Sequence, residues 1–225
     1  MDIRYLGHAA FEFTHGATSV LIDPFLSGNP TAAATAAELH PNVILLTHGH
    51  GDHYGDIVPI AKRTGATVVA ITEIAGELEG EGIADVRNAN LGGTVAFDWG
   101  SVKLVPAWHT STTPNGTVST PAGMIIEIGG KTVYHLGDTA LFGDLELIGR
   151  RHAIDVALVC IGGYFTMDRH DAVEAVRLIG PRQVIPCHYD TFPPIQTDVG
   201  AFKADVEGST ASEVIVLAPG EHHSA

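Results

Sequence analysis

The chain has 225 residues, 45% of them hydrophobic and 26 of them glycine, which suits a globular α/β protein with a sizeable core. Lys and Arg number 12 against 26 Asp and Glu, and the net charge of -14 would repel a phosphate backbone or an anionic membrane surface. We therefore expect no nucleic-acid partner and no membrane partner, and since no linker is visible we expect one domain over residues 1–225.

The N-terminus and the cysteines point to a cytoplasmic protein. Residues 1–4 lack the basic start and apolar core of a secretory signal, and no apolar run reaches transmembrane length. Cys160 and Cys187 each lie in an apolar run typical of a strand, which favours reduced thiols in a core over a disulfide framework.

The first elements form a short antiparallel meander, with strands expected at 2–6, 10–14 and 18–22. His8 falls in the first turn and could be either a surface residue or a pocket residue. Asp23 follows the third strand, where its carboxylate could cap the strand end or accept a hydrogen bond from a metal-binding histidine.

The most informative stretch follows the apolar strand 43–47 and carries four metal-capable side chains within six positions. If the backbone stays extended, the alternation of side chains places His48 and His50 on one face, aimed at one ion. The intervening glycines allow a turn that swings Asp52 and His53 toward a second ion. The stretch therefore predicts two adjacent metal ions.

Helices and strands then alternate along the chain. We expect helices near 55–63, 72–79, 140–149, 169–179 and 197–206, and strands near 67–71, 84–88, 94–98, 102–107, 122–128, 131–136, 154–160, 183–187 and 214–217. This order predicts an α/β sheet with helices on its faces. The paired His222 and His223 near the end are expected to lie in a mobile tail.

Three further candidate ligands follow predicted strands. His109 could instead be exposed beside Trp108, and Asp138 could instead be the N-cap of the next helix. Between Cys187 and His188 only one side chain can face a site at the strand end, and we assign His188 because Cys187 continues the buried run. Since ligands converge where strand ends gather, these residues are expected to meet the His48–His53 stretch.

The series H-x-H-x-D-H, a lone His, an Asp and a last His resembles the metallo-β-lactamase superfamily across nearly the whole chain. Several further segments are similar to its compact metal-dependent hydrolases related to the ascorbate-6-phosphate lactonase branch. These segments are Gly7-His8, Asp23-Pro24-Phe25, Gly137-Asp138-Thr139, Phe165-Thr166-Met167 and His188 to Pro193. The resemblance implies a four-layer αββα sandwich, and it is compatible with a homo-oligomer.

The resemblance also implies the roles of the candidate residues. His48, His50 and His109 would hold one metal, Asp52, His53 and His188 the other, Asp138 would bridge them, and Asp23 would support the histidine loop. An Asp at the bridging position, where many true β-lactamases have Cys, argues against antibiotic hydrolysis. The flavo-diiron branch has an acidic ligand at the position of His50, so this histidine favours hydrolysis over redox chemistry. No basic extension like the glutathione-binding part of glyoxalase II follows His188, which argues against thioester specificity of that kind.

The expected activity is hydrolysis of a small ester, lactone or phosphoester. Two divalent ions can share a water and lower its pKa from ~15.7 toward ~7, giving a hydroxide that attacks the carbonyl or phosphoryl centre. Asp52, Asp138 and His8 are the catalytic candidates, and Asp138, His8 or His135 could handle the leaving group's proton. No G-x-S-x-G motif supports a serine nucleophile.

The sequence is compatible with several metals and with two rival functions. Five His and two Asp suit Zn, Mn, Fe, Co or Ni, of which zinc is our first expectation and manganese our second. The rivals are a diiron redox protein and a catalytically silent protein that keeps its metals and binds a small ligand.

Overall fold

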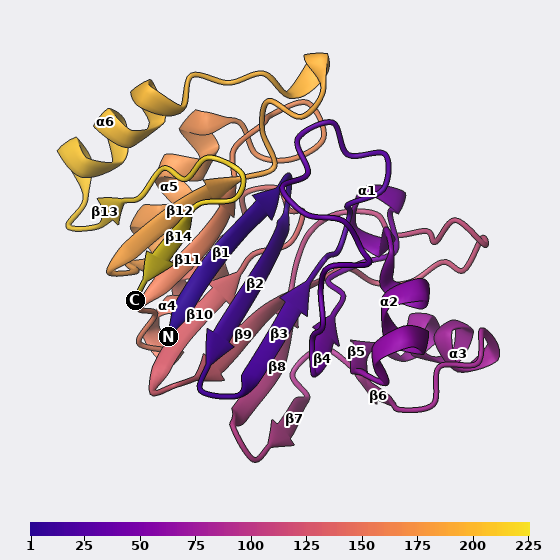
Figure 1. The fold of residues 1–225 in the computed structure, drawn as a ribbon. Coiled ribbons are helices and arrows are strands. Elements are labelled where there is room, and N and C mark those ends of the chain that lie inside the picture. Colours follow the sequence, from indigo (N-terminus) through magenta and orange to yellow (C-terminus); the bar gives the residue numbers. More distant parts are fainter.

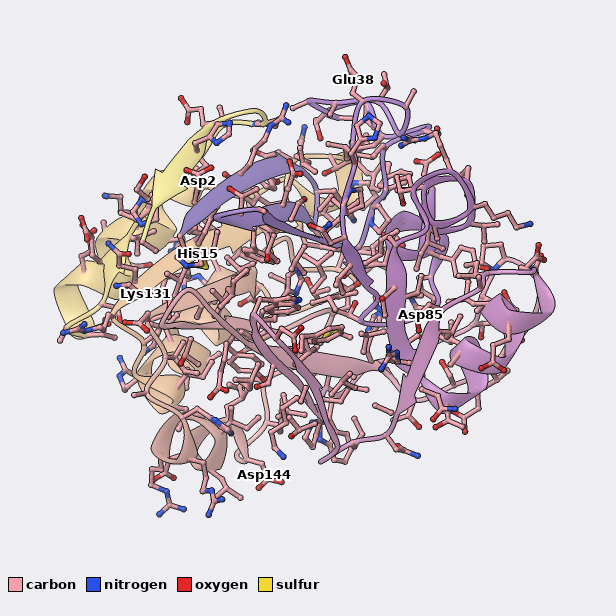
Figure 2. The ribbon with its side chains drawn as sticks, turned by 60° about the horizontal axis from the view of Figure 1, so that its bottom comes forward. Asp2, His15, Glu38, Asp85, Lys131 and Asp144 are labelled. Atoms are coloured by element: carbon pink, nitrogen blue, oxygen red, sulfur yellow. The ribbon has the colours of Figure 1, made fainter.

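The computed structural model describes residues 1–225 and contains two seven-stranded mixed sheets packed face to face. Helices cover the outer face of each sheet, so the four-layer αββα sandwich implied by the sequence is confirmed (Figure 1). Acidic side chains such as Asp2, Glu38 and Asp144 lie at the periphery of the molecule (Figure 2). A cluster of 40 buried residues, drawn from both sheets and from the helices on the first, forms the main core.

The first sheet combines an antiparallel half and a parallel half. Its order is β14-β1-β2-β3-β4-β5-β6, antiparallel from β14 to β3 and parallel from β3 to β6. The strands are β1 (Asp2–Gly7), β2 (Ala10–His15), β3 (Thr18–Ile22), β4 (Val43–Leu45), β5 (Thr67–Ile71), β6 (Val86–Ala89) and β14 (His222–Ser224). The parallel strands β4 and β5 are almost wholly apolar because helices cover them on the outside.

The second sheet is built in the same way. Its order is β13-β12-β11-β10-β9-β8-β7, antiparallel from β7 to β10 and parallel from β10 to β13. The strands are β7 (Thr94–Phe97), β8 (Gly100–Pro106), β9 (Ala122–Ile128), β10 (Lys131–His135), β11 (Val156–Cys160), β12 (Gln183–Cys187) and β13 (Glu213–Val214). Cys160 and Cys187 are both buried and unpaired, as predicted.

The helices follow the strands that they cover. They are α1 (Gly51–Tyr54), α2 (Ile57–Thr64), α3 (Thr72–Gly80), α4 (Leu145–Arg151), α5 (Arg169–Ile179) and α6 (Val199–Ser209). Asp168 caps α5, because its side chain accepts hydrogen bonds from the backbone N–H groups of His170 and Asp171. None of these helices has the length and apolar character that crossing a bilayer requires.

Three sequence predictions need correction. The C-terminal residues form β14, which pairs with β1, so the prediction of a mobile tail is wrong. His222 Nδ1 lies 2.6 Å from Asp2 Oδ2, and β14 covers what would otherwise be an open sheet edge. The helix expected at 140–149 begins only at Leu145, and the last strand of the second sheet is limited to Glu213–Val214.

Candidate metal centre

Eight side chains that can bind metal meet where strands of both sheets end. One group contains His48, His50, His109 and Asp138, and the other contains His8, Asp52, His53 and His188. Within each group the candidate ligand atoms all lie within 4.8 Å of one another. The structure therefore brings together the residues that the sequence nominated as ligands, and it adds His8 to the group of Asp52, His53 and His188.

The first group lies between the loop after β4 and the end of β8. His48 Nε2 is 3.0 Å from His50 Nδ1, so these two rings face one point, as their spacing predicted. His109 Nε2 approaches the same point and lies 3.5 Å from Asp138 Oδ2. The side chain of His109 is only 15% exposed, so the alternative of a surface residue beside Trp108 is wrong.

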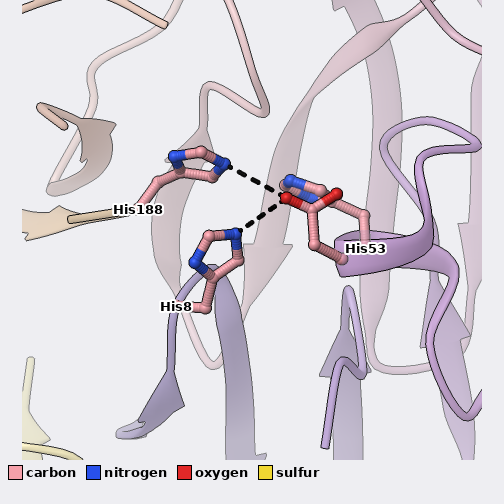
Figure 3. A group of neighbouring side chains, drawn as sticks. His8, His53 and His188 are labelled. Carbon is pink, nitrogen blue, oxygen red and sulfur yellow. Dashed lines mark hydrogen bonds and ion pairs between the residues drawn. The ribbon is translucent and has the colours of Figure 1, made fainter. Parts of the chain in front are cut away.

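The second group gathers residues from three distant parts of the chain (Figure 3). The short helix α1 supplies Asp52 and His53. Asp52 Oδ2 lies 3.1 Å from His8 Nε2 and 3.7 Å from His188 Nε2. His8 is fully buried, which decides against a surface position in the first turn.

Asp138 lies between the two groups. Its Oδ1 is 3.2 Å from His53 Nε2, and its Oδ2 is 3.1 Å from His188 Nε2 and 3.5 Å from His109 Nε2. Because α4 starts seven residues later, with Asp144 at its N-cap position, the alternative role of Asp138 as a helix cap is wrong. Its carboxylate is buried and can reach both groups at once.

Asp23 fixes two histidines from behind. Its buried carboxylate accepts hydrogen bonds from Thr47 N at 2.9 Å, Thr47 Oγ1 at 2.7 Å and His53 Nδ1 at 2.7 Å. Since the Thr47 hydroxyl donates to Asp23, it can accept from His48 Nδ1, which is 3.1 Å away. Both rings are thereby held with the Nε2 lone pair toward the centre, which is how outer partners orient metal-binding histidines.

The residues present fit a divalent cation. His53 Nε2, His188 Nε2 and Asp138 Oδ1 are buried and have no hydrogen-bond partner. Leaving such an atom unpaired costs about 1–3 kcal/mol, so buried polar atoms in folded proteins are nearly always satisfied. A cation among these atoms would serve all three, and imidazole nitrogen with carboxylate oxygen is a donor set that zinc and related metals accept.

Charges at the centre shift its pKa values strongly. Burial would lower the pKa of His53, but the charges of Asp138 and Asp23 raise it well above its usual value. Burial would likewise lower the pKa of His188, but the carboxylates of Asp138 and Asp52 raise it to about 9. Burial would raise the pKa of Asp138, and His188 and His53 hold it well below its usual range. The clustered carboxylates of Asp23, Asp52 and Asp138 thus stabilise a positive charge at the centre.

The metal-free protein is expected to lose stability as pH rises from about 6.5 to about 9. His188 has a pKa of about 9 in the folded chain, against roughly 6.5 when unfolded. Its extra proton stabilises the fold fully below pH 6.5, and this contribution vanishes as pH passes through the folded pKa. Urea unfolding of chelator-treated protein should show a loss of roughly 2–3 kcal/mol across this range. In His188→Gln the loss should be smaller, because only His53, whose pKa is also raised, would still contribute. An equal loss in this variant would contradict the assignment.

His135 cannot take the proton-handling role that the sequence left open for it. Its Nε2 donates to the carbonyl oxygen of Ala9 at 3.0 Å, and its Nδ1 accepts from Gly137 N at 3.0 Å. Both ring nitrogens are therefore used by the backbone, and that alternative is wrong. The prediction for the pair at the end of β12 is right, because Cys187 packs into the main core while His188 faces the centre.

Sequence reasoning missed two hydroxyl groups that support the centre. Ser111 Oγ accepts a hydrogen bond from Gly49 N at 2.9 Å and so joins the His48–His53 loop to the loop after His109. Thr191 Oγ1 lies 2.8 Å from His8 Nδ1. Thr191 belongs to a segment already singled out by resemblance, whereas no sequence signal marks Ser111.

Comparisons with known proteins place the chain among relatives of known family. A family model described as a beta-lactamase superfamily domain matches residues 18–189. A UPF0173 metal-dependent hydrolase of Pelotomaculum thermopropionicum is 47% identical over 98% of both chains, and one of Thermus thermophilus is 48% identical over 98% of this chain and 97% of its own. The solved structure of Igni18, a metallo hydrolase of Ignicoccus hospitalis, has a TM-score of 0.90 and 37% identity over 99% of this chain and 97% of that chain.

Proposed function

This chain belongs to the beta-lactamase superfamily as one of its metal-dependent hydrolases, and we propose that it works with a pair of divalent ions on a small ester, lactone or phosphoester. His48, His50 and His109 would hold one ion, and Asp52, His53 and His188 the other. The observation that carries the proposal is the position of Asp138, whose Oδ2 lies 3.1 Å from His188 Nε2 and 3.5 Å from His109 Nε2, one residue of each group.

Two divalent ions in this position would supply a hydroxide nucleophile at neutral pH and polarise the carbonyl or phosphoryl oxygen under attack. The chain's own residues would orient the metal-binding rings and transfer protons during this reaction. Asp23 fixes the ring of His53, and Asp138 is too deeply buried to exchange protons with solvent. Asp52 is 31% exposed, so its carboxylate is our candidate for passing a proton to the departing oxygen.

His8 has a supporting role in this proposal. Its Nδ1 contacts Thr191 Oγ1 at 2.8 Å and its Nε2 contacts Asp52 Oδ2 at 3.1 Å, so neither nitrogen is free for the leaving group. Burial lowers the pKa of His8 to about 4, which leaves the ring neutral at physiological pH. A neutral ring that donates from Nε2 would hold Asp52 in place.

Zinc remains our first candidate for the metal and manganese the second, since the nitrogen and oxygen donor set accepts either ion. The buried, unpaired thiols of Cys160 and Cys187 are consistent with a cytoplasmic location.

The proposal is tested by preparing the protein without added metal and reconstituting it with zinc or manganese. Hydrolysis of 4-nitrophenyl acetate, a γ-lactone and bis(4-nitrophenyl) phosphate is then measured against bound metal. We expect turnover of at least one substrate that reaches its maximum near two equivalents, disappears with a chelator and returns with metal. Failure across the whole panel with every metal would favour a silent ligand-binding protein, and a redox-active iron pair detected by spectroscopy would favour the diiron alternative.

A further inference from the structure

Three aromatic side chains stand exposed on two loops, of which one carries His109 and the other follows β11. Trp108 is 67% exposed, Tyr164 80% and Phe165 54%, and we call these three residues the aromatic rim. Every other aromatic side chain in the protein is buried or half-buried. Exposing apolar side chains to water costs free energy, so a group of exposed apolar residues beside a functional site indicates a binding surface.

The aromatic rim is joined directly to the candidate ligands. Trp108 precedes His109, and its backbone N–H donates to Thr139 Oγ1 at 3.0 Å, next to Asp138. The loop of Tyr164 and Phe165 is joined to the same residue, since Met167 N donates to Thr139 O at 3.1 Å. Thr139, the residue after Asp138, therefore links the two loops that carry the aromatic rim.

The loop after β11 is also held against His188. A Cβ added to Gly162 would lie 2.2 Å from the His188 carbonyl oxygen, so the two backbones touch. Tyr164 has a φ of +55°, a left-handed conformation that is unusual for a residue with a side chain. Its ring packs edge-on against Phe165 with 4.7 Å between centroids. The backbone thus presents both rings outward at a cost in strain, which is typical of functional loops.

Cationic side chains are absent from every loop of the centre. All 12 Lys and Arg residues fall outside residues 5–61, 104–130, 132–149, 152–168 and 183–202, and these five segments contain all eight candidate ligands and the aromatic rim. The neighbouring Arg169 is ion-paired with Asp205. Proteins that recognise a phosphate or carboxylate usually employ Arg or Lys. Apart from the metal ions, an anionic substrate group would find no Lys or Arg on these segments.

From these two independent observations we propose that the substrate is an uncharged ester or lactone whose acyl or aryl group packs on the aromatic rim. This inference rests on the proposed hydrolase function and narrows it to carbonyl substrates. In the reaction the oxygen of water bonds to the acyl carbon, the acyl carbon–oxygen bond breaks with its electron pair, and the departing alkoxide takes up a proton. The products are a carboxylic acid and an alcohol, which in the case of a lactone are the two ends of one hydroxy acid.

The test compares 4-nitrophenyl acetate, butyrate and octanoate with the metal-loaded protein. We expect kcat/KM to rise by about two- to fourfold for each added methylene that packs on the rim. Trp108→Ala and Phe165→Ala should each reduce the octanoate-to-acetate ratio about fivefold or more, and Trp108→Phe should restore part of it. Leu147→Ala is the matched control, because Leu147 is likewise exposed, at 49%, but lies on α4. The octanoate-to-acetate ratio of this variant should equal that of the parent protein.

Charge preference is tested with two esters of similar length. The neutral 4-nitrophenyl valerate should be hydrolysed about tenfold faster than the anionic 4-nitrophenyl hemisuccinate, in terms of kcat/KM. A flat response to chain length, or equal rates for the neutral and anionic esters, would overturn the inference while leaving the hydrolase proposal intact. Hydrolysis of bis(4-nitrophenyl) phosphate alone would likewise overturn the inference and leave the hydrolase proposal intact. Absence of turnover with every substrate would instead count against the proposed function.

A binding readout separates the aromatic rim from catalysis. The protein has two tryptophans, so Trp99→Phe leaves Trp108 as the only one. Titration of this metal-loaded variant with 2-decanone, a neutral and non-hydrolysable ester mimic, should shift or quench its fluorescence. No change would overturn the inference. A lower sedimentation mass of Trp108→Ala than of the parent would also overturn it, by showing that a second copy of the chain covers the rim.

Discussion

Replacing Asp138 by alanine is expected to reduce bound metal from about two equivalents per chain to one or fewer. The carboxylate contacts His188 at 3.1 Å and His109 at 3.5 Å, so its removal takes a ligand from both proposed ions. We expect kcat/KM to fall by more than the roughly 10–100-fold that loss of an outer partner costs. Metal analysis of protein purified without added metal provides the measurement.

Asp144→Ala is the control for this experiment. Asp144 is exposed and precedes α4 on the same segment of chain, so its replacement should leave the metal content unchanged. Two equivalents retained in folded Asp138→Ala would show that the carboxylate does not bridge. Circular dichroism of both variants distinguishes this result from misfolding.

Asp23→Asn is expected to weaken metal binding by about 10–100-fold without removing any proposed ligand. The amide cannot accept all three hydrogen bonds that the carboxylate takes from Thr47 and His53. The ring of His53 then loses the partner that holds its Nε2 toward the centre. Competition with a chromophoric chelator measures the change in affinity.

Asp56→Asn provides a matched comparison, because Asp56 is another buried carboxylate that accepts backbone hydrogen bonds, from Leu26 at 3.1 Å and Ser27 at 2.7 Å. It makes no hydrogen bond to a histidine of the centre. Its replacement should lower stability but leave the metal affinity of the folded protein unchanged. An equal loss of affinity in both variants would mean that Asp23 acts only through general stability.

The candidate ligands were predictable because each follows an apolar strand, and strand ends of an α/β fold gather at one place. His48, His50, Asp52 and His53 were also marked by their close spacing. The position of Asp138 between the groups was implied only by resemblance, since a Gly-Asp step after a strand suits a helix cap equally well. The structure decides between these alternatives because α4 begins at Leu145.

Other features depend on contacts between distant residues and left no local signal. His8 is buried by residues nearly two hundred positions away, including Thr191 and Phe192, whose ring centroid is 5.5 Å from that of His8. The strand at His222–Ser224 forms because β1 offers it an edge, although its sequence has little strand character. The exposure of Trp108 and Tyr164 likewise became visible only in three dimensions.

Left-handed backbone geometry at the centre has a consequence for protein design. His8, Asp23 and His188 have φ values of +58°, +47° and +55°, each of which costs roughly 1–2 kcal/mol for a residue with a side chain. A designer who grafts only the eight side chains onto a new scaffold would therefore place His8 and His188 on an ordinary main chain, aim their rings wrongly and leave out Asp23. A successful graft would have to include the strained turns themselves, together with the parts of the sheets that hold them in place.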